Sequence, residues 1–175
     1  MNLKRRNSAV IVIGVLAIAA GIFFGAQRYA PAPPQPAAVA ELFGQTLPDA
    51  NGTPQQLAQW RGKTLIVNFW ATWCAPCVEE MPELTQLQTE LTGKSIQIIG
   101  IGIDSAENIR KFADRLHISY PLYTAGVRGT ELARLFGNQA GGLPYTVVIT
   151  ADSQIKASHL GRLQMAELRR QLPQE

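Results

Sequence analysis

Residues 65–77 read Leu65-Ile66-Val67-Asn68-Phe69-Trp70-Ala71-Thr72-Trp73-Cys74-Ala75-Pro76-Cys77, and this stretch decides the fold. It opens with an apolar run of strand length and ends in the only two cysteines of the chain, at a point where a buried strand is followed by a helix. Two thiols separated by two residues at a helix N-terminus can close a disulfide with little backbone movement. Unpaired amides and the positive end of the helix dipole favour the first sulfur, that of Cys74, as a thiolate. The stretch therefore predicts a redox-active dithiol.

Three other uses of the cysteine pair fit the sequence less well. A structural disulfide usually joins residues distant in sequence, because a short loop removes little entropy from the unfolded chain. A zinc site needs about two more cysteine or histidine ligands, and His117 and His159 are single and far apart. Haem attachment through a CxxCH motif fails because Val78 follows the second cysteine. We therefore expect no metal and no cofactor other than the Cys74–Cys77 disulfide.

Outward from this stretch, apolar segments of strand length alternate with segments of helical spacing. Strands are expected over 65–70, 95–103 and 145–150, with 155–159 as an antiparallel partner, and helices over 74–91, 106–116, 130–136 and 164–172. This alternation predicts an α/β fold with a central mixed, mostly parallel sheet and helices on both faces. Pro82 lies inside the first of these helices, where proline removes a backbone hydrogen bond.

The N-terminal part predicts a membrane anchor. Basic residues within 1–7 precede an uncharged stretch over 8–26, which has close to the roughly 20 residues that span a bilayer as a helix. Their charge places 1–7 in the cytoplasm and the rest of the chain across the membrane, so the dithiol is expected to face an oxidising compartment. A cleaved signal peptide is the alternative, with Ala38-Val39-Ala40 as its cleavage site. A Pro/Ala-rich linker over 27–40 and one globular domain over 41–175 are expected to follow.

The charge of the chain gives no sign of a nucleic-acid partner. All 13 acidic residues but only 12 of the 16 basic ones lie within 41–175, so the expected domain carries a net charge of about −1 although the whole chain carries +3.

From Val67 to Cys77, and on through Glu80-Met81-Pro82, the sequence resembles the thioredoxin superfamily, and within it the membrane-anchored TlpA/ResA-type thiol-disulfide oxidoreductases of bacteria. Upstream, 47–63 is similar to the N-terminal hairpin of this branch. Downstream, Gly142-Leu143-Pro144 is similar to the loop that carries the superfamily's cis-proline, and 104–136 to the central helical insertion. The resemblance implies a thioredoxin-like fold over most of 41–175. It also implies a single-pass anchor in the bacterial inner membrane with the catalytic domain in the periplasm.

The resemblance also implies roles for the residues around the dithiol. Cys74, at an exposed helix tip, is expected to attack a substrate disulfide, and Cys77 to resolve the mixed disulfide. Superfamily members hold the cis-proline against the dithiol, so Pro144 and the backbone of Leu143 are expected to bind the substrate strand. Trp73 and Pro76 flank the cysteines and are expected to complete the substrate-binding surface.

Two further positions bear on how a thiol proton moves. Cytosolic thioredoxins carry a buried aspartate at the position of Asn68, and an amide cannot replace it in proton transfer. The TlpA/ResA branch often places a glutamate three residues after the second cysteine, where this chain has Glu80. Cys77 and Glu80 share one side of a helix, so the carboxylate can accept or return the thiol proton. The alternative is that Glu80, like Glu79, is a solvated residue of the first helical turn.

The expected function is the reduction of protein disulfides, which the resemblance extends to apocytochrome c as a frequent client and to a membrane electron donor of the DsbD/CcdA kind. A disulfide-forming oxidase or isomerase would use the same residues. A third hypothesis is a non-enzymatic module that binds copper or peptides, for which Met81 is the sole additional ligand candidate near the cysteines.

Overall fold

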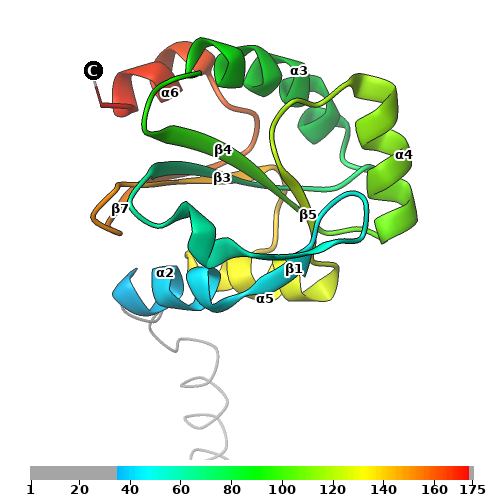
Figure 1. Cartoon of the computed structure of the whole chain (residues 1–175), viewed down its shortest axis with the longest axis horizontal. Helices are drawn as coiled ribbons and strands as arrows, with labels where there is room; N and C mark the ends of the chain where they lie inside the picture. Colours follow the sequence, from blue (N-terminus) through cyan, green and yellow to red (C-terminus); the bar gives the residue numbers. More distant parts are fainter. Residues whose placement is uncertain (1–34, 174–175) are drawn as a thin grey trace, which may run out of the picture. The chain divides into compact units, whose positions relative to one another are not determined.

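A computed structural model describes residues 35–173 of the protein (Figure 1). The predicted cytoplasmic segment 1–7, the predicted anchor 8–26 and the linker residues 27–34 lie outside this range. Within 35–173, none of the helices has the length and apolar character needed to cross a membrane. In chain order the elements are α2 (Gln35–Gly44), β1 (Thr46–Pro48), β2 (Pro54–Gln56), the 3-10 helix η1 (Leu57–Trp60), β3 (Thr64–Trp70), α3 (Ala75–Glu90), β4 (Ile96–Gly102), α4 (Ala106–Leu116), β5 (Leu122–Thr124), α5 (Val127–Leu135), β6 (Tyr145–Ile149), β7 (Ile155–Leu160) and α6 (Met165–Gln171).

The central sheet has five strands in the order β5-β4-β3-β6-β7. β3 pairs in parallel with β4, and β4 with β5, whereas β6 runs antiparallel to both β3 and β7. The prediction of a mostly parallel sheet is therefore wrong, because half of the pairings are antiparallel. The reason lies in the connections between strands. The chain enters β6 at the end of the sheet where β3, β4 and β5 finish, so β6 runs against them, and a tight turn then joins β6 to β7. The predicted N-terminal hairpin is present as β1 and β2.

Helices cover both faces of this sheet, as predicted, with α3, α4 and α6 on one side and α2 and α5 on the other (Figure 1). Every residue of β3 is buried. Ile66 and Trp70 pack under α3, and Leu65, Val67 and Phe69 pack over α2 and α5. Because side chains of a strand alternate between faces, Asn68 points to the α3 side together with Ile66 and Trp70.

The predicted linker over 27–40 is wrong at its C-terminal end, since α2 begins at Gln35. Ala38, Val39, Leu42 and Phe43 of this helix are buried against the sheet. Proline at the second position of the helix does not interrupt it, because the first amides of a helix have no intrahelical partner. The folded domain therefore begins at or before residue 35 rather than at 41.

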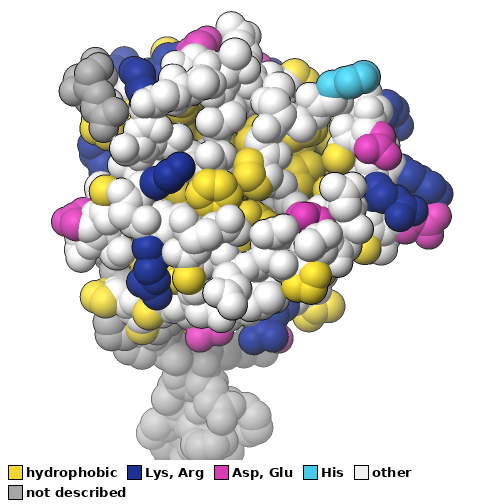
Figure 2. All heavy atoms as spheres, in the orientation of Figure 1, with side chains coloured by type: hydrophobic (Ala, Val, Ile, Leu, Met, Phe, Trp, Pro, Cys, Tyr) yellow, Lys and Arg dark blue, Asp and Glu magenta, His cyan; other side chains and the backbone are white. Residues whose placement is uncertain are grey.

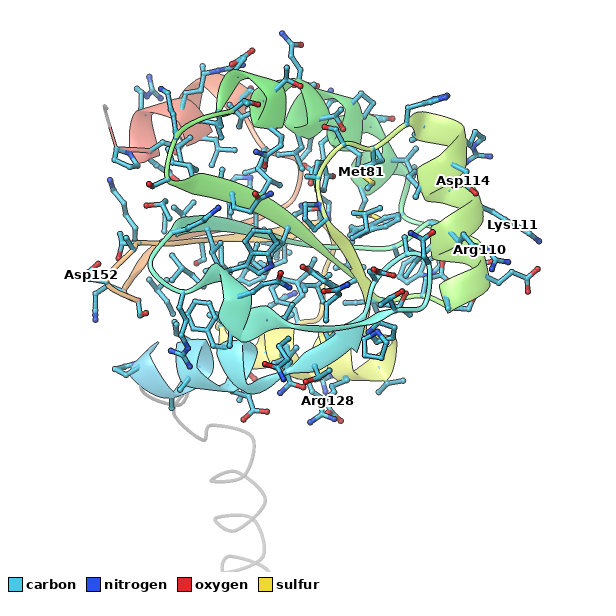
Figure 3. All side chains as sticks on the ribbon, viewed as in Figure 1. Met81, Arg110, Lys111, Asp114, Arg128 and Asp152 are labelled. Carbon is cyan, nitrogen blue, oxygen red and sulfur yellow. A yellow bond between two sulfur atoms is a disulfide. The ribbon has the colours of Figure 1, made fainter. Side chains whose placement is uncertain are left out.

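The segment predicted as a helical insertion, 104–136, also contains a strand. β5 is three residues long and forms the edge of the sheet beside β4. An edge strand this short has too few residues to show the alternation that marks a strand in sequence. Charged residues of α4, among them Arg110, Lys111 and Asp114, project from its outer side (Figure 3).

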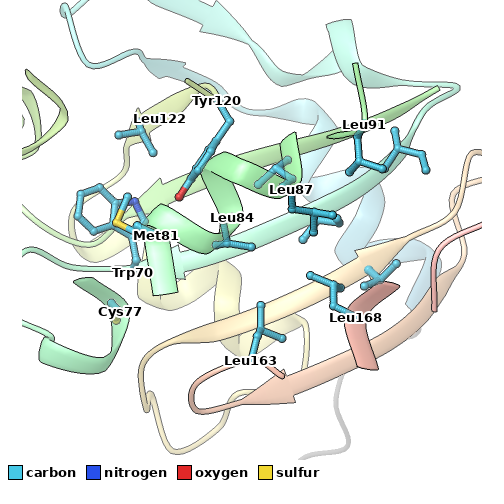
Figure 4. Packing of buried hydrophobic residues seen from close by; sticks show 14 of the residues in the cluster. Trp70, Cys77, Met81, Leu84, Leu87, Leu91, Tyr120, Leu122, Leu163 and Leu168 are labelled. Carbon is cyan, nitrogen blue, oxygen red and sulfur yellow. The ribbon is translucent and has the colours of Figure 1, made fainter. Parts of the chain in front are cut away.

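The buried side of α3 carries Cys77, Met81, Leu84 and Leu87, which pack against the sheet together with Trp70 and Tyr120 (Figure 4). Helical spacing brings one charged residue, Glu80, onto the same buried side. A carboxyl group in an apolar stripe needs hydrogen-bond partners, and these partners define the site described below.

A shallow hollow of about 340 Å³ lies between the β1–β2 hairpin and β5, on the face shown in Figure 2, where apolar side chains gather. Its lining includes Trp60, Pro121 and Leu122 and none of the predicted site residues. The dithiol therefore lies outside this hollow, and its position is determined by the end of β3.

Candidate functional site

The dithiol lies at the junction of β3 and α3, as the sequence predicts. Cys74 is the N-cap of α3, and Pro76 occupies the first turn, where proline is well tolerated. Cys74 and Cys77 form a disulfide across a Cα–Cα distance of 5.3 Å. The amide of Cys77 donates to the Cys74 sulfur at 3.3 Å. In the reduced protein the same amide would stabilise a Cys74 thiolate, because hydrogen bonds to the charged form lower a thiol pKa.

The two sulfurs are less accessible than expected. Cys74 is only 6% exposed and Cys77 is fully buried, so the description of Cys74 as an exposed helix tip is wrong. Both cysteines pack in the apolar cluster under α3, and this packing explains why their exposure is lower than predicted. Trp73 is 69% exposed, and Ala75 and Pro76 between the cysteines are exposed as well, so these residues form the accessible surface beside the disulfide.

The Leu143–Pro144 peptide bond is cis, as the resemblance implies. Pro144 is buried, and Leu143 packs against the cluster that contains both cysteines. Within residues 35–173, the amide and carbonyl of Leu143 make no hydrogen bond. The backbone at Leu143 thus has hydrogen-bonding groups without a partner among these residues, and its pairing with a substrate strand stays a prediction.

The segment before the cis-proline is held in place by residues that the sequence did not single out. The buried Asn138 side chain donates to the carbonyl of Gly142 at 2.8 Å. Tyr145 donates its hydroxyl to the carbonyl of Phe136 at 2.7 Å. Leu160, an exposed apolar residue at the end of β7, lies close to Gly142. These contacts fix the loop from both ends.

Glu80 is completely buried, so the interpretation of it as a solvated residue of the first turn is wrong. Its Oε1 accepts a hydrogen bond from Asn68 Nδ2 at 2.7 Å, and its Oε2 accepts one from the amide of Leu163 at 3.0 Å. Burial raises the pKa of the Glu80 carboxyl above its usual value of 4.5, and the two hydrogen bonds and the charges of His159 and Arg162 offset part of this rise. A carboxyl group with a raised pKa, one helical turn from Cys77, is suited to exchange a proton with that thiol.

The register of the sheet explains why Asn68 meets Glu80. Asn68 pairs with Thr146 of β6, and Thr146 pairs with His159 of β7, so the three side chains form a row on the α3 side of the sheet. The Asn68 amide also donates to Thr146 Oγ1 at 3.0 Å. Asn68 cannot transfer a proton as the aspartate of cytosolic thioredoxins does, but its side chain donates a hydrogen bond to the Glu80 carboxylate.

The charge of Glu80 also acts on a buried phenol, that of Tyr120. Tyr120, just before β5, is fully enclosed, and burial together with the charge of Glu80 raises the pKa of its hydroxyl far above the ordinary tyrosine value. Tyr120 therefore stays protonated at every physiological pH. The sequence did not indicate that Tyr120 or Thr146 belongs to the site. Each lies more than 39 residues from Glu80, in an apolar segment without a recognisable motif.

Metal binding finds no support in the described part of the chain. No group of three or more histidine, cysteine, aspartate or glutamate side chains in residues 35–173 is arranged to hold a metal ion. Met81, the ligand candidate of the copper hypothesis, is fully buried in the core between α3 and the sheet (Figure 4).

Comparison with known proteins extends this description. Residues 32–172 match the family described as Redoxin. The thiol-disulfide oxidoreductase ResA of Geobacillus thermodenitrificans is 29% identical over 139 residues, 76% of this chain and 78% of the relative. ResA of Halalkalibacterium halodurans is 28% identical over 167 residues, which cover 94% and 92% of the two chains. A thioredoxin-family thiol:disulfide interchange protein from Chlorobium tepidum TLS has a TM-score of 0.60 at 29% identity, over 73% of this chain and 92% of that chain.

Proposed function

The chain belongs to the Redoxin family and is a thiol-disulfide oxidoreductase of the ResA type, and on this premise we propose that it works as a reductase of protein disulfides in the periplasm. Its redox group is the Cys74–Cys77 disulfide. The observation that carries the dithiol chemistry is the buried Glu80 carboxylate one turn from Cys77, held by Asn68 and by the amide of Leu163. The reducing direction and the periplasmic location are proposed from the resemblance to TlpA/ResA-type proteins.

The reaction begins with the reduced dithiol. The Cys74 thiolate attacks one sulfur of a client disulfide, the client S–S bond breaks, and the second client sulfur leaves as a thiolate that takes up a proton. A mixed disulfide between Cys74 and the client remains. The amide of Cys77, which donates to the Cys74 sulfur in the oxidised protein, favours the attacking thiolate.

The second step needs a proton acceptor inside the protein. Cys77 is fully buried, so its thiol cannot pass a proton directly to water. Glu80 takes this proton, and the Cys77 thiolate displaces the client from Cys74. The client sulfur leaves as a thiolate and is protonated, and two electrons have passed from the dithiol to the client. The raised pKa of Glu80 suits this role, because proton transfer is more favourable between groups of similar pKa.

The client and the electron donor are proposed from the resemblance. A client strand would pair with the free backbone of Leu143 beside Pro144, with Trp73, Pro76 and the exposed Leu160 around it. Apocytochrome c before haem attachment is the client that we propose. A membrane dithiol carrier of the DsbD/CcdA kind would return two electrons to the Cys74–Cys77 disulfide. The basic and apolar N-terminal segments 1–26 would anchor the protein as a single-pass protein of the inner membrane.

Exchange of each cysteine tests the chemistry. Cys74→Ser should abolish the reduction of insulin disulfides, because the remaining thiol, Cys77, is fully buried and cannot reach a client disulfide. Cys77→Ser should retain the first step and accumulate mixed disulfides, which gel electrophoresis without reductant detects. Identification of the proteins captured by Cys77→Ser in the periplasm tests the client. Full insulin reduction by Cys74→Ser would refute the mechanism.

The direction of electron flow is tested by the reduction potential. A value near that of thioredoxin, about −270 mV, agrees with a reductase, whereas a value near that of DsbA, about −120 mV, would indicate a disulfide-forming oxidase. Protease digestion of intact cells and of spheroplasts tests the location, since a periplasmic domain is cleaved only after the outer membrane is opened.

A further inference from the structure

The loop between β7 and α6, residues 161–164, touches both halves of the site. We call it the brace loop. At its start, the amide of Gly161 donates to the carbonyl of Pro144 at 2.8 Å. Two residues later, the amide of Leu163 donates to Glu80 Oε2 at 3.0 Å. One short segment therefore contacts the cis-proline loop through one amide and the buried carboxylate through another.

Arg162 lies between these two amides and points to α3. Its Nη1 donates to Glu79 Oε2 at 3.1 Å, and its Nη2 donates to Glu83 Oε1 at 2.7 Å. The two acidic residues are on either side of Glu80 in sequence, and all three belong to α3. The planar guanidinium thus joins the brace loop to α3 on the outside, while the Leu163 amide joins it to Glu80 on the inside.

We propose that Arg162 is a positioning residue for the resolving step: it holds the brace loop against α3 so that the Leu163 amide stays within hydrogen-bond distance of Glu80. The proposal deepens the proposed function and rests on Glu80 as the proton acceptor. Loss of the amide would leave Asn68 as the one hydrogen-bond donor to the carboxylate among the described residues.

The Arg162 ion pairs act locally and do not hold the fold together. Arg162, Glu79 and Glu83 are 46%, 61% and 42% exposed, and ion pairs with this exposure add little to overall stability. Leu163, by contrast, is buried in the core and keeps the loop folded without Arg162. Removal of the arginine is therefore expected to change the position of one amide and to leave the domain intact.

Charged and titratable side chains from several elements lie near Glu80. In the oxidised protein these groups are Glu79 and Glu83 on α3, Tyr120 before β5, His159 on β7 and Arg162 in the brace loop. His159 Nε2 lies 3.2 Å from the carbonyl of Arg162, so the histidine contacts the brace loop as well. Replacement of Arg162 therefore removes a positive charge near Glu80 and also the hydrogen bonds between the brace loop and α3. Variants that change only one of the two separate these effects.

The experiment compares Arg162→Ala with Arg169→Ala in the full-length oxidised protein. Arg169 is a matched control, because it also pairs from the C-terminal part of the chain with a glutamate of α3, Glu90, at 2.8 Å. The pKa of Glu80 is followed by carbon NMR of the carboxyl group, and hydrogen exchange reports the Leu163 amide. For Arg162→Ala we expect the pKa of Glu80 to rise by about one pH unit and the Leu163 amide to exchange several-fold faster. For Arg169→Ala we expect neither change.

The double variant Glu79→Gln/Glu83→Gln keeps the arginine and removes its partners. Faster exchange of the Leu163 amide in this variant is expected, and it would show that the ion pairs, and not the arginine charge alone, hold the loop. Unchanged exchange in both Arg162→Ala and the double variant would overturn the proposal.

Failure of the proposed function gives a different result. If Glu80 is not the proton acceptor, Glu80→Gln will leave the pH profile of insulin reduction unchanged. The effect of Arg162→Ala on the Glu80 pKa and on Leu163 exchange does not depend on that outcome. A shifted pH profile of reduction in Arg162→Ala, with an unshifted one in Arg169→Ala, is the result expected when both proposals hold.

Discussion

At the scale of single residues, Glu80 is the side chain with the most unusual surroundings. It lies on the apolar side of α3 with two hydrogen-bond donors, Asn68 and Leu163, and burial raises the pKa of its carboxyl group. Burial of a charged carboxyl group lowers the stability of the folded protein, and functional sites are where proteins retain such groups. The cost should be visible in the stability of the protein.

The pH dependence of stability tests this cost through Glu80→Gln. Because the folded protein holds the Glu80 proton more tightly than the unfolded chain, the wild type should lose stability relative to the variant as the pH rises from about 4.5 through the raised pKa. The loss should reach about 1.4 kcal/mol for each pH unit by which the folded pKa exceeds the unfolded one. Urea unfolding between pH 4 and pH 8 measures it.

The variant can keep its hydrogen bonds. A glutamine at position 80 can accept from the Leu163 amide, and rotation of the Asn68 amide presents its oxygen to the new NH₂ group. Glu107→Gln on the exposed side of α4 is the control, and its stability should follow that of the wild type. A constant stability difference between wild type and Glu80→Gln over this pH range would contradict a raised pKa.

Residues of the site were predictable from sequence where a local motif contains them. Cys74 and Cys77 are recognisable from their spacing after an apolar run, and Glu80 and Pro144 from the resemblance. Thr146, Arg162 and Leu163 were not, because they reach Glu80 only through strand register and loop placement, more than 60 residues along the chain. His159 had no visible partner in the sequence, yet its charge acts on Glu80.

At the scale of elements, α5 shows how closely a helix can approach the sheet. Gly129 is the third residue of this helix, and a methyl group there would come within 2.9 Å of Ile103 Cγ1 and 3.2 Å of Ala125 Cβ. The absence of a side chain lets α5 pack directly against this part of the fold. The close approach outweighs the low helix propensity of glycine.

Two glycine substitutions should therefore have opposite effects. Gly129→Ala should lower the free energy of unfolding by about 1–3 kcal/mol, since overpacking exceeds the gain in propensity. Gly44→Ala, in α2, meets no atom within 4 Å and should raise it by about 0.5–1 kcal/mol. Chemical denaturation of both variants measures the difference. Equal effects of the two substitutions would show that the space around Gly129 is not limiting.

Elements were predictable from sequence to the degree that their pattern was long and regular. The strands at 65–70 and 145–150 and the helix after Cys74 have long apolar patterns, and the structure contains them as β3, β6 and α3. The start of α2 was missed, because Pro36 in a Pro/Ala-rich segment is typical of a linker as well as of a helix start. The direction of β6 depends on a connection whose path the alternation of elements does not determine.

At the scale of the whole domain, α2 completes the lower layer of the core. Val39, Leu42 and Phe43 are at most 4% exposed, and the Arg61 guanidinium covers the Phe43 ring at 4.5 Å. Burial of a Val, Leu or Phe side chain contributes about 1.5–3 kcal/mol. Without α2, the sheet would expose the surface that carries Leu65, Val67 and Phe69.

Truncation at two positions tests where the domain begins. A fragment of residues 35–175 should unfold in one cooperative transition and reduce insulin. A fragment of residues 45–175 should lose roughly 5 kcal/mol or more, a large share of the total stability of a typical domain. Thermal unfolding followed by circular dichroism compares them. Equal melting temperatures would contradict the position of α2 in the core.

The 6% exposure of Cys74 has a consequence for which cystines the protein can open. Displacement at sulfur proceeds along the axis of the breaking bond, so the incoming cystine has to align its axis with a recessed attacker. A cystine in a rigid globule, enclosed by its own neighbours, cannot adopt this trajectory. A cystine in a slack, unfolded polypeptide can. We therefore expect the recess to favour the disulfides of chains still awaiting assembly over the finished disulfides of mature proteins.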